Sequence, residues 1–174
     1  VIEQLADAID ANQSNPKLRM ELGMTYEGAT LNKLAESIYK QYTSQFPKRI
    51  IGWYRMAIVQ QRMGQLEEAI QTLEAGVEYA PAKMAAPHWQ LGLWLIDAGR
   101  IEEAKGHVAA ASAIKPNSMQ VQIANGRIAL AEGKPEIAIE ILNNNQLIAI
   151  VPDGYVYQLL GRAYRAAGEE EKSR

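Results

Sequence analysis

Apolar residues recur three and four positions apart over most of the chain, with polar residues between them. The spacing is clear in three stretches, which read "LRMELGMTYEGA" (18–29), "WYRMAIVQQRMG" (53–64) and "WQLGLWLIDAG" (89–99). Residues spaced in this way lie on one face of an α-helix, so each stretch predicts an amphipathic helix. The pattern therefore predicts an all-α chain.

Glycines separate the predicted helices at regular intervals. Gly64, Gly99, Gly133 and Gly168 stand 35, 34 and 35 residues apart. Glycine adopts the left-handed conformation that ends many helices without the steric cost of a Cβ atom, so each one predicts a helix end and a tight turn. Pro135 follows one of these glycines at a position where the first turn of a helix tolerates a residue without an N–H group.

Alanines and prolines repeat in step with these glycines. Ala35, Ala69, Ala104 and Ala138 recur every 34 or 35 residues, and a proline follows each of the first three alanines by 12 residues. A helix pair of this size cannot bury its apolar stripe alone, but a stack of such pairs can. We therefore divide residues 1–174 into a preceding helix (1–15), four repeats that together cover 16–152 (16–49, 50–83, 85–118 and 119–152), and the first helix of a truncated fifth repeat (153–174).

The period and the residue order resemble the tetratricopeptide repeat (TPR) family, whose pattern is W-x2-L-G-x2-Y, then A-x3-F, then P. The matching residues are Leu22, Gly23, Tyr26, Ala35, Tyr39 and Pro47 in the first repeat, Trp53, Ala69, Leu73 and Pro81 in the second, and Leu91, Gly92, Ala104, Val108 and Pro116 in the third. The resemblance covers residues 16–168. It implies a right-handed α-solenoid of stacked antiparallel helix pairs, a superhelix in which the first helix of each repeat lines a concave groove.

Some positions depart from this pattern. The second repeat has Met56 and Ala57 in place of Leu-Gly, and the third has His88 in the tryptophan slot. In the fourth repeat, "NNNQLIAIVPDG" breaks the expected spacing, so its second helix is expected to end early or to be displaced. The small residues of the pattern, such as Gly23 and Gly92, are expected at the close approach of the two helices of a pair, and the recurring alanines where the helices cross.

The composition narrows the possible functions. The chain has 20 acidic and 18 basic residues and a net charge of −2, so no strong field attracts nucleic acid or an anionic membrane. It has no cysteine, which excludes disulfides, thiolate nucleophiles and cysteine-type zinc sites. No apolar run approaches the ~20 residues that cross a bilayer. We expect a soluble chain without direct membrane insertion. Of the two compartments that we consider, the cytoplasm is slightly favoured over the periplasm.

Residues suited to catalysis or metal binding are sparse. His88 and His107 are the only histidines in the sequence. A metal site would need carboxylates placed beside them, and the sequence shows no such cluster. We interpret His88 as a packing residue. The chain lacks the glycine-rich phosphate-binding motifs, the nucleophile elbow and the H-E-x-x-H zinc motif. We expect no catalytic activity, no metal and no cofactor.

The inner face of the predicted first helices is the remaining candidate for a site. Its residues lie three and four apart, on the side away from the packing stripe. They are Lys17, Met20, Met24, Glu27, Ile51, Tyr54, Ile58, Gln61, Trp89, Leu93, Ile96, Ile123, Arg127, Leu130, Tyr155, Gln158, Arg162 and Arg165. Apolar residues on a face expected to meet water indicate a partner. The candidate partner-binding residues are Met20, Met24, Tyr54, Ile58, Trp89, Leu93, Arg127, Arg162 and Arg165.

These residues favour a non-catalytic scaffold that holds a peptide or helix of a partner protein. Methionine adapts to irregular shapes and aromatic rings anchor interfaces, while the arginines suit an acidic flank. Against this stands the interpretation that Met24, Ile58, Leu93 and Leu130 only pack against neighbouring helices. The TPR class that grips chaperone carboxylates has Lys and Asn where this chain has Met20 and Met24, so that ligand is not implied.

Two other functions remain open. One is self-assembly, because the last predicted helix lacks its partner and we expect its stripe of Leu159, Leu160 and Ala163 to be exposed and able to dock another copy. The other is an accessory interaction region of a larger multidomain protein or enzyme.

Overall fold

The computed structural model describes residues 2–12, 15–79, 84–144 and 154–168. These residues form ten α-helices and no strand, which confirms the all-α fold class. The chain divides into two compact units, Val1–Ala82 (unit 1) and Lys83–Arg174 (unit 2). Among the described residues, no helix combines the length and the apolar character that a bilayer-crossing segment needs.

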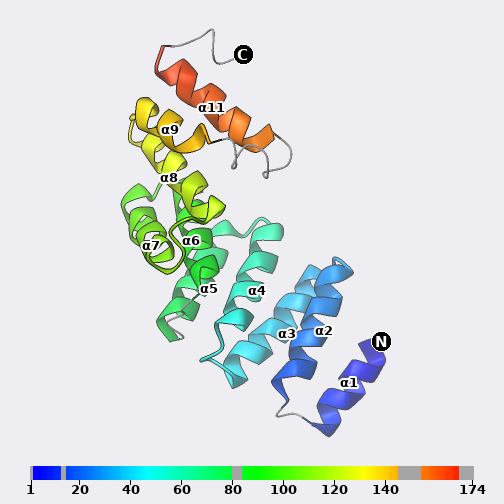
Figure 1. Cartoon of the computed structure of the whole chain (residues 1–174). Coiled ribbons are helices and arrows are strands. Elements are labelled where there is room, and N and C mark those ends of the chain that lie inside the picture. The colour runs from blue at the N-terminus through cyan, green and yellow to red at the C-terminus, as the bar shows by residue number, and fades with distance from the viewer. Residues whose placement is uncertain (1, 13–14, 80–83, 145–153, 169–174) are drawn as a thin grey trace. The chain divides into compact units, whose positions relative to one another are not determined.

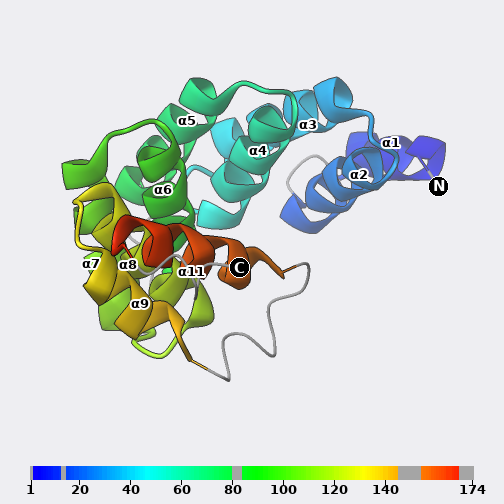
Figure 2. The ribbon, with the colours of Figure 1, turned by 90° about the horizontal axis from the view of Figure 1, so that it is seen from above.

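Unit 1 is a stack of helices in which each one packs against the next in the chain (Figure 1). Its helices are α1 (Ile2–Ala11), α2 (Pro16–Gly28), α3 (Asn32–Gln45), α4 (Ile50–Arg62) and α5 (Leu66–Tyr79). The pairs α2–α3 and α4–α5 lie side by side in both ribbon views (Figures 1 and 2). Helix α1 packs against α2, with Leu5 and Ile9 buried.

Unit 2, described by itself, is built in the same way. Its helices are α6 (Ala85–Asp97), α7 (Ile101–Ile114), α8 (Met119–Ala131), α9 (Pro135–Leu142) and α11 (Tyr155–Ala166). Helices α6 and α7 form one pair and α8 and α9 another, and α11 packs against both α8 and α9 (Figure 2). Stacked helix pairs are therefore present in each unit.

The glycine turns are as the sequence predicts. Gly64, Gly99, Gly133 and Gly168 have φ angles of 81°, 76°, 71° and 79°, the left-handed region that a Cβ atom disfavours. Helices α4, α6, α8 and α11 end just before these residues. A side chain at any of the four positions would strain the backbone and so weaken the turn.

The recurring small residues are tightly packed. Ala35, Ala69, Ala104 and Ala138 are all fully buried. A Cβ atom added to Gly23 would lie 2.4 Å from the Tyr39 ring, far inside van der Waals contact. The close approach predicted at Gly23 is confirmed, and the four alanines are buried as a helix crossing requires.

The second helix of the fourth pair, α9, is short, as the broken spacing in the sequence predicts. Helix α9 has 8 residues, whereas α3, α5 and α7 have 14 each. The irregular stretch covers 143–154, and its residues 145–153 lie outside the described residues. The boundaries of the four repeats remain predictions.

The expectation of an exposed apolar stripe on the last helix is wrong. Leu159, Leu160 and Ala163 are 2%, 5% and 0% exposed. They belong to core clusters with residues of α8 and α9, among them Leu142 and Ala138. The stripe faces the preceding helix pair, which already buries it, so it offers no surface for a second copy of the chain.

Candidate functional site

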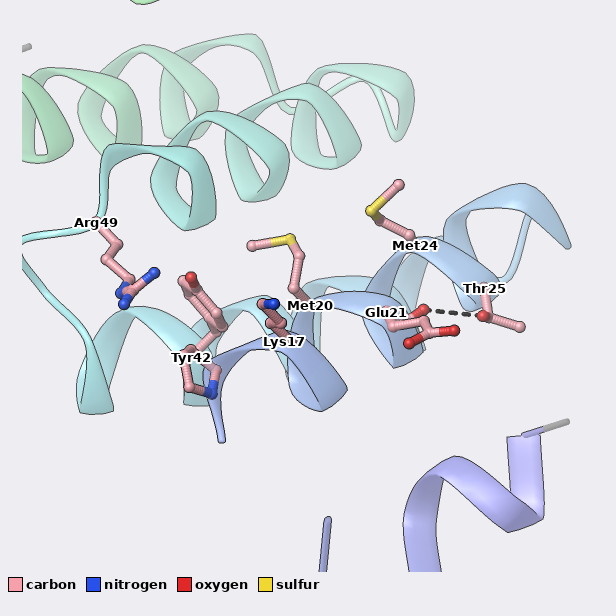
Figure 3. A pocket seen from close by; sticks show the side chains of 8 residues that line it. Lys17, Met20, Glu21, Met24, Thr25, Tyr42 and Arg49 are labelled. Atoms are coloured by element: carbon pink, nitrogen blue, oxygen red, sulfur yellow. Dashed lines mark hydrogen bonds between the residues drawn. The ribbon is translucent and has the colours of Figure 1, made fainter. Parts of the chain in front are cut away.

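A pocket of about 520 Å³ opens on unit 1 between α2, the C-terminal part of α3 and the residue that precedes α4 (Figure 3). The residues that line it are Pro16, Lys17, Met20, Glu21, Met24, Thr25, Tyr42 and Arg49. Two of the predicted partner-binding residues, Met20 and Met24, thus lie together in one hollow. We call it the methionine pocket.

Helix α2 supplies most of the lining, and its first turn is capped. The Asn15 side chain accepts a hydrogen bond from the backbone N–H of Lys17 at 3.0 Å, and Pro16 occupies the first turn, where no N–H is needed. From that start, Lys17, Met20 and Met24 follow three and four positions apart and so share one face of the helix. Met24 is 45% exposed although it is apolar.

The other wall of the pocket is the Tyr42 ring, which is fixed in place. Tyr42 is 2% exposed, and its ring centroid lies 5.2 Å from that of Phe46. A Cβ atom at Gly52 would lie only 2.4 Å from the Tyr42 ring, so α4 reaches the ring only because this residue is glycine. The pocket therefore has a rigid aromatic side and a flexible methionine side.

The two ends of the methionine pocket carry charges of opposite sign. Figure 3 shows Arg49 beyond Tyr42 at one end, Lys17 in the middle, and Glu21 with Thr25 at the other end. Lys17, Arg49 and Glu21 are exposed, and neither cation forms an ion pair with a carboxylate of the described residues. The Thr25 hydroxyl donates to the backbone carbonyl of Glu21 at 2.8 Å. The pocket can thus hold an apolar side chain, with an acidic group toward Arg49 and a basic group toward Glu21.

Glu27 does not face the partner side of α2, and this prediction is wrong. Its carboxylate is buried and accepts hydrogen bonds from the Tyr39 hydroxyl at 2.9 Å and from Arg62 at 2.8 Å, while Arg55 lies at 3.3 Å. Burial raises the pKa of Tyr39, and the hydrogen bond to Glu27 adds to this effect. The carboxylate ties α2 to α4 and has a structural role.

Tyr54 and Ile58, the predicted partner-binding residues on α4, are half-buried. Neither is among the residues that line the methionine pocket. Burial raises the pKa of the Tyr54 phenol. The structure does not bring these two residues together with Met20 and Met24 in one hollow.

In unit 2, two of the predicted arginines share a smaller pocket of about 300 Å³. Arg127 and Arg162 line it together with Ile96, Asp97, Leu130 and Ala131. Arg127 forms an ion pair with Asp97, whereas Arg162 is exposed and has no ion pair with a described carboxylate. Arg165 is exposed but is not among the lining residues.

The apolar residues predicted for the inner face of unit 2 are largely used in packing. Trp89 and Leu93 are partly buried against a core cluster that includes Val121 and Ile128. Ile123 is 9% exposed and is itself part of a core cluster, so its assignment to the partner-binding face is wrong. Its position on α8 faces α11, which covers it.

The two histidines form a pair that sequence reasoning missed. The Nδ1 atoms of His88 on α6 and His107 on α7 lie 3.3 Å apart, and the ring centroids lie 5.6 Å apart. Burial lowers the pKa of both imidazoles, and each ring is half-buried. Among the described residues, no group of three or more His, Asp or Glu side chains is arranged to hold a metal ion. The sequence could have indicated this pair, because the two positions face each other when the two helices of one repeat pack together.

Residues 52–83 match the family described as tetratricopeptide repeat. A comparison with curated protein sequences gives no match.

Solved structures resemble the chain over nearly its whole length. A tetratricopeptide repeat protein from Parabacteroides merdae has 18% identity and a TM-score of 0.81, with 99% of this chain and 68% of that one covered. YrrB, described as a TPR protein with an unusual peptide-binding site, has 15% identity and a TM-score of 0.77, with 99% and 88% covered. A chain of the APC/C hetero-tetramer Cut9–Hcn1 has 16% identity and a TM-score of 0.79, with 97% of this chain covered. This chain spans only 34% of that last one. At such identities the likeness concerns the fold.

Proposed function

We propose that this chain, whose residues 52–83 match the tetratricopeptide repeat family and whose fold resembles solved proteins of that kind, binds a segment of a partner protein. In this proposal the methionine pocket of unit 1 takes an apolar side chain of the segment. The chain acts as a scaffold that binds and does not catalyse.

The observation that carries the proposal is the exposure of Met24 beside two cations, Lys17 and Arg49, which form no ion pair with a carboxylate of the described residues. An apolar side chain at 45% exposure, next to the half-buried Met20 and the Tyr42 ring, leaves apolar surface in contact with water. Covering such surface stabilises a complex by about 25 cal/mol per Å² before the costs of association are subtracted. Methionine side chains adapt to different shapes, so the pocket accepts several apolar residues.

Charge selects the direction in which a segment lies. An Asp or Glu next to the apolar anchor meets Arg49 and Lys17, whereas the opposite orientation places it beside Glu21. Opposed charges at the rim act mainly on the rate and specificity of association. The partner is therefore a protein segment with an apolar anchor and an acidic flank.

The proposal also includes the predicted partner-binding residues that lie outside the methionine pocket. Tyr54 and Ile58 in unit 1, and Trp89, Leu93 and Arg165 in unit 2, remain candidates for additional contacts. In the smaller pocket of unit 2, Arg162 is the cation available to an acidic side chain, because Arg127 is already paired with Asp97. That YrrB is described as having a peptide-binding site supports peptide recognition by this fold.

The experiment starts from a random peptide library displayed on phage and selected on the whole chain. We expect the selected peptides to share one large apolar residue with Asp or Glu close to it. The affinity of one such peptide is then measured by fluorescence polarisation for the wild type and for variants. Met24→Gln is expected to weaken binding by about tenfold or more, as truncation of an interface anchor does.

Matched controls exist for both parts of the site. Met84 is 45% exposed, as Met24 is, but lies in unit 2, so Met84→Gln is expected to leave the affinity unchanged. Lys48 precedes Arg49 and is exposed but does not line the pocket, so Lys48→Glu is expected to weaken binding less than Arg49→Glu. Equal affinities of the wild type and a Met20→Gln/Met24→Gln double variant for the selected peptides would contradict the proposal.

A further inference from the structure

A second hollow on unit 1 is lined by residues of α3, α4 and α5 and measures about 470 Å³. It shares no lining residue with the methionine pocket. Its main feature is an aromatic pair: the rings of Trp53 and Tyr79 stack with centroids 5.7 Å apart and planes inclined by 13°. Tyr79 is 59% exposed, so one of the two rings lies largely in water.

The local sequence places the aromatic pair firmly. A Cβ atom at Gly76 would lie 2.4 Å from the Cβ atom of Trp53, so α5 approaches Trp53 this closely only because residue 76 is glycine. The indole N–H of Trp53 donates to the backbone carbonyl of Pro47 at 2.9 Å. The polar atom of this ring is therefore already satisfied, and the ring offers apolar surface to a ligand.

The rest of the hollow offers few polar contacts. The Thr43 hydroxyl donates to the backbone carbonyl of Lys40 at 3.0 Å, and Met56 contributes a side chain that is 7% exposed. Lys40 is the one charged residue of the lining; it is exposed and has no ion pair with a described carboxylate. A ligand for this surface is thus largely apolar, needs few hydrogen bonds, and carries one negative charge.

We propose that this hollow binds a proline-rich segment in the polyproline II conformation with an acidic residue beside it. A polyproline II helix has no internal hydrogen bonds and keeps its backbone solvated, so it needs only flat apolar surfaces for its rings. Aromatic-lined grooves bind such segments, and the preformed conformation reduces the entropy lost on binding. The acidic residue pairs with Lys40.

An amphipathic helix fits this surface less well. Helical ligands use anchors spread over several turns along an extended apolar groove. Here the apolar lining is limited to Pro47, Trp53, Met56 and Tyr79, of which Met56 is almost fully buried. The binding of a proline-rich segment is independent of the function proposed for the methionine pocket.

The test uses the whole chain and an acetylated peptide of about nine prolines, three turns of polyproline II, that ends in one aspartate. The protein carries ¹³C-methyl methionine, so that Met56 reports on this hollow and Met20 and Met24 report on the methionine pocket. We expect a saturable shift of the Met56 signal while the Met20 and Met24 signals stay in place. A peptide with serines in place of prolines is expected to bind at least about tenfold more weakly, because it lacks the ring contacts that anchor an interface.

Variants locate the contact. Tyr79→Ala is expected to lower the affinity about tenfold, the loss seen when an aromatic anchor is removed. Tyr157→Ala is the control, since Tyr157 is 62% exposed but lies on α11. Lys40→Glu is expected to weaken binding, whereas Lys33→Glu, on an exposed position of the same helix, is not.

Three results would overturn the inference. They are the absence of any saturable shift at millimolar peptide, equal binding of the serine peptide, and equal binding by the Tyr79→Ala variant. A Met56 shift caused by an amphipathic helical peptide but not by the proline peptide also contradicts it and identifies a helix as the occupant.

Discussion

Unit 1 and unit 2 share the glycines and alanines that recur every 34 or 35 residues in the sequence. The interiors of the two units nevertheless differ in polarity. Among the described residues, unit 1 buries Arg19, Glu27, Thr43 and Gln60, whereas unit 2 buries one polar side chain, Ser118. The repeated glycines, alanines and prolines specify where helices end and cross. They leave the chemistry of the interior free to vary.

The contacts at the close helix approaches differ in the same way. In unit 1 the glycines meet aromatic rings, such as Gly23 against Tyr39 and Gly52 against Tyr42. In unit 2, Gly92 meets Val108 and Gly126 meets Leu142. The two larger hollows described above both lie on unit 1, with Tyr42 or Trp53 as a wall. The difference teaches that a binding property found on one unit cannot be transferred to the other through the repeat pattern.

The largest expected effect concerns the buried carboxylate of unit 1. Glu27→Ala leaves the Tyr39 hydroxyl and two arginines without their acceptor, and removal of one partner of a buried ion pair costs about 3–5 kcal/mol. Because Arg55 and Arg62 are 33% and 49% exposed, water offsets part of this, and we expect a loss of roughly 2–3 kcal/mol. Urea unfolding followed by circular dichroism measures it.

The matched change in unit 2 is Asp97→Ala, which removes an ion pair whose carboxylate is 49% exposed. We expect a loss below about 1 kcal/mol, as for surface ion pairs. Equal losses for the two variants would remove the distinction between the units.

A second pair of variants tests what the units share. Ala69 and Ala104 are both fully buried at a helix crossing, so Ala69→Leu and Ala104→Leu are each expected to overpack it and cost about 1–3 kcal/mol. Thermal unfolding gives the size of the effect. If either variant melts at the same temperature as the wild type, the site accommodates a leucine side chain and the predicted overpacking is wrong there.

A smaller effect is expected at the helix caps. The Ser118 hydroxyl accepts from the backbone N–H of Val121 at 3.3 Å and Asn15 caps α2 in the same manner, so their replacement by alanine is expected to cost about 1 kcal/mol each. Ser118 is buried, and its variant is expected to lose more than Asn15→Ala in the same denaturation assay. The opposite order contradicts the assigned burial.

The smallest effect is a pH dependence confined to unit 2. Burial lowers the pKa of His88 and His107, and His107 also senses Arg100, which lowers its pKa, and Glu103, which raises it. Below about pH 6.5 the unfolded chain then binds more protons than the folded one, so stability falls as pH decreases through this window and is fully present above it. Both rings are half-buried, which keeps the effect modest.

A His88→Gln/His107→Gln variant is the control for this pH dependence. We expect its thermal stability to change less between pH 7.5 and pH 5.5 than that of the wild type. A steeper loss in the variant than in the wild type would show that other groups cause the dependence.

Much of the backbone is predictable from the sequence because its determinants are local. Gly64 and Gly99 end helices through their own φ angles, and Ala35 and Ala69 are recognisable by their period. The short α9 was also expected, from the break in spacing that follows Leu142.

The site was predictable only in part, because it depends on contacts between distant segments. Met20 and Met24 follow from the face of α2, but Tyr42 and Arg49 come from later segments that helical spacing cannot connect to it. Glu27 was misassigned since its partner Arg62 lies 35 residues further on.

The central claim, that the methionine pocket receives the apolar anchor of a partner segment, is tested most directly by a ¹³C-methyl methionine spectrum of the whole chain. The six methionines include Met20 and Met24 in the pocket, and Met84 and Met119 in unit 2. On addition of a selected peptide, we predict that the Met20 and Met24 signals shift in proportion to occupancy while those of Met84 and Met119 do not. Shifts confined to Met84 and Met119 would contradict the account.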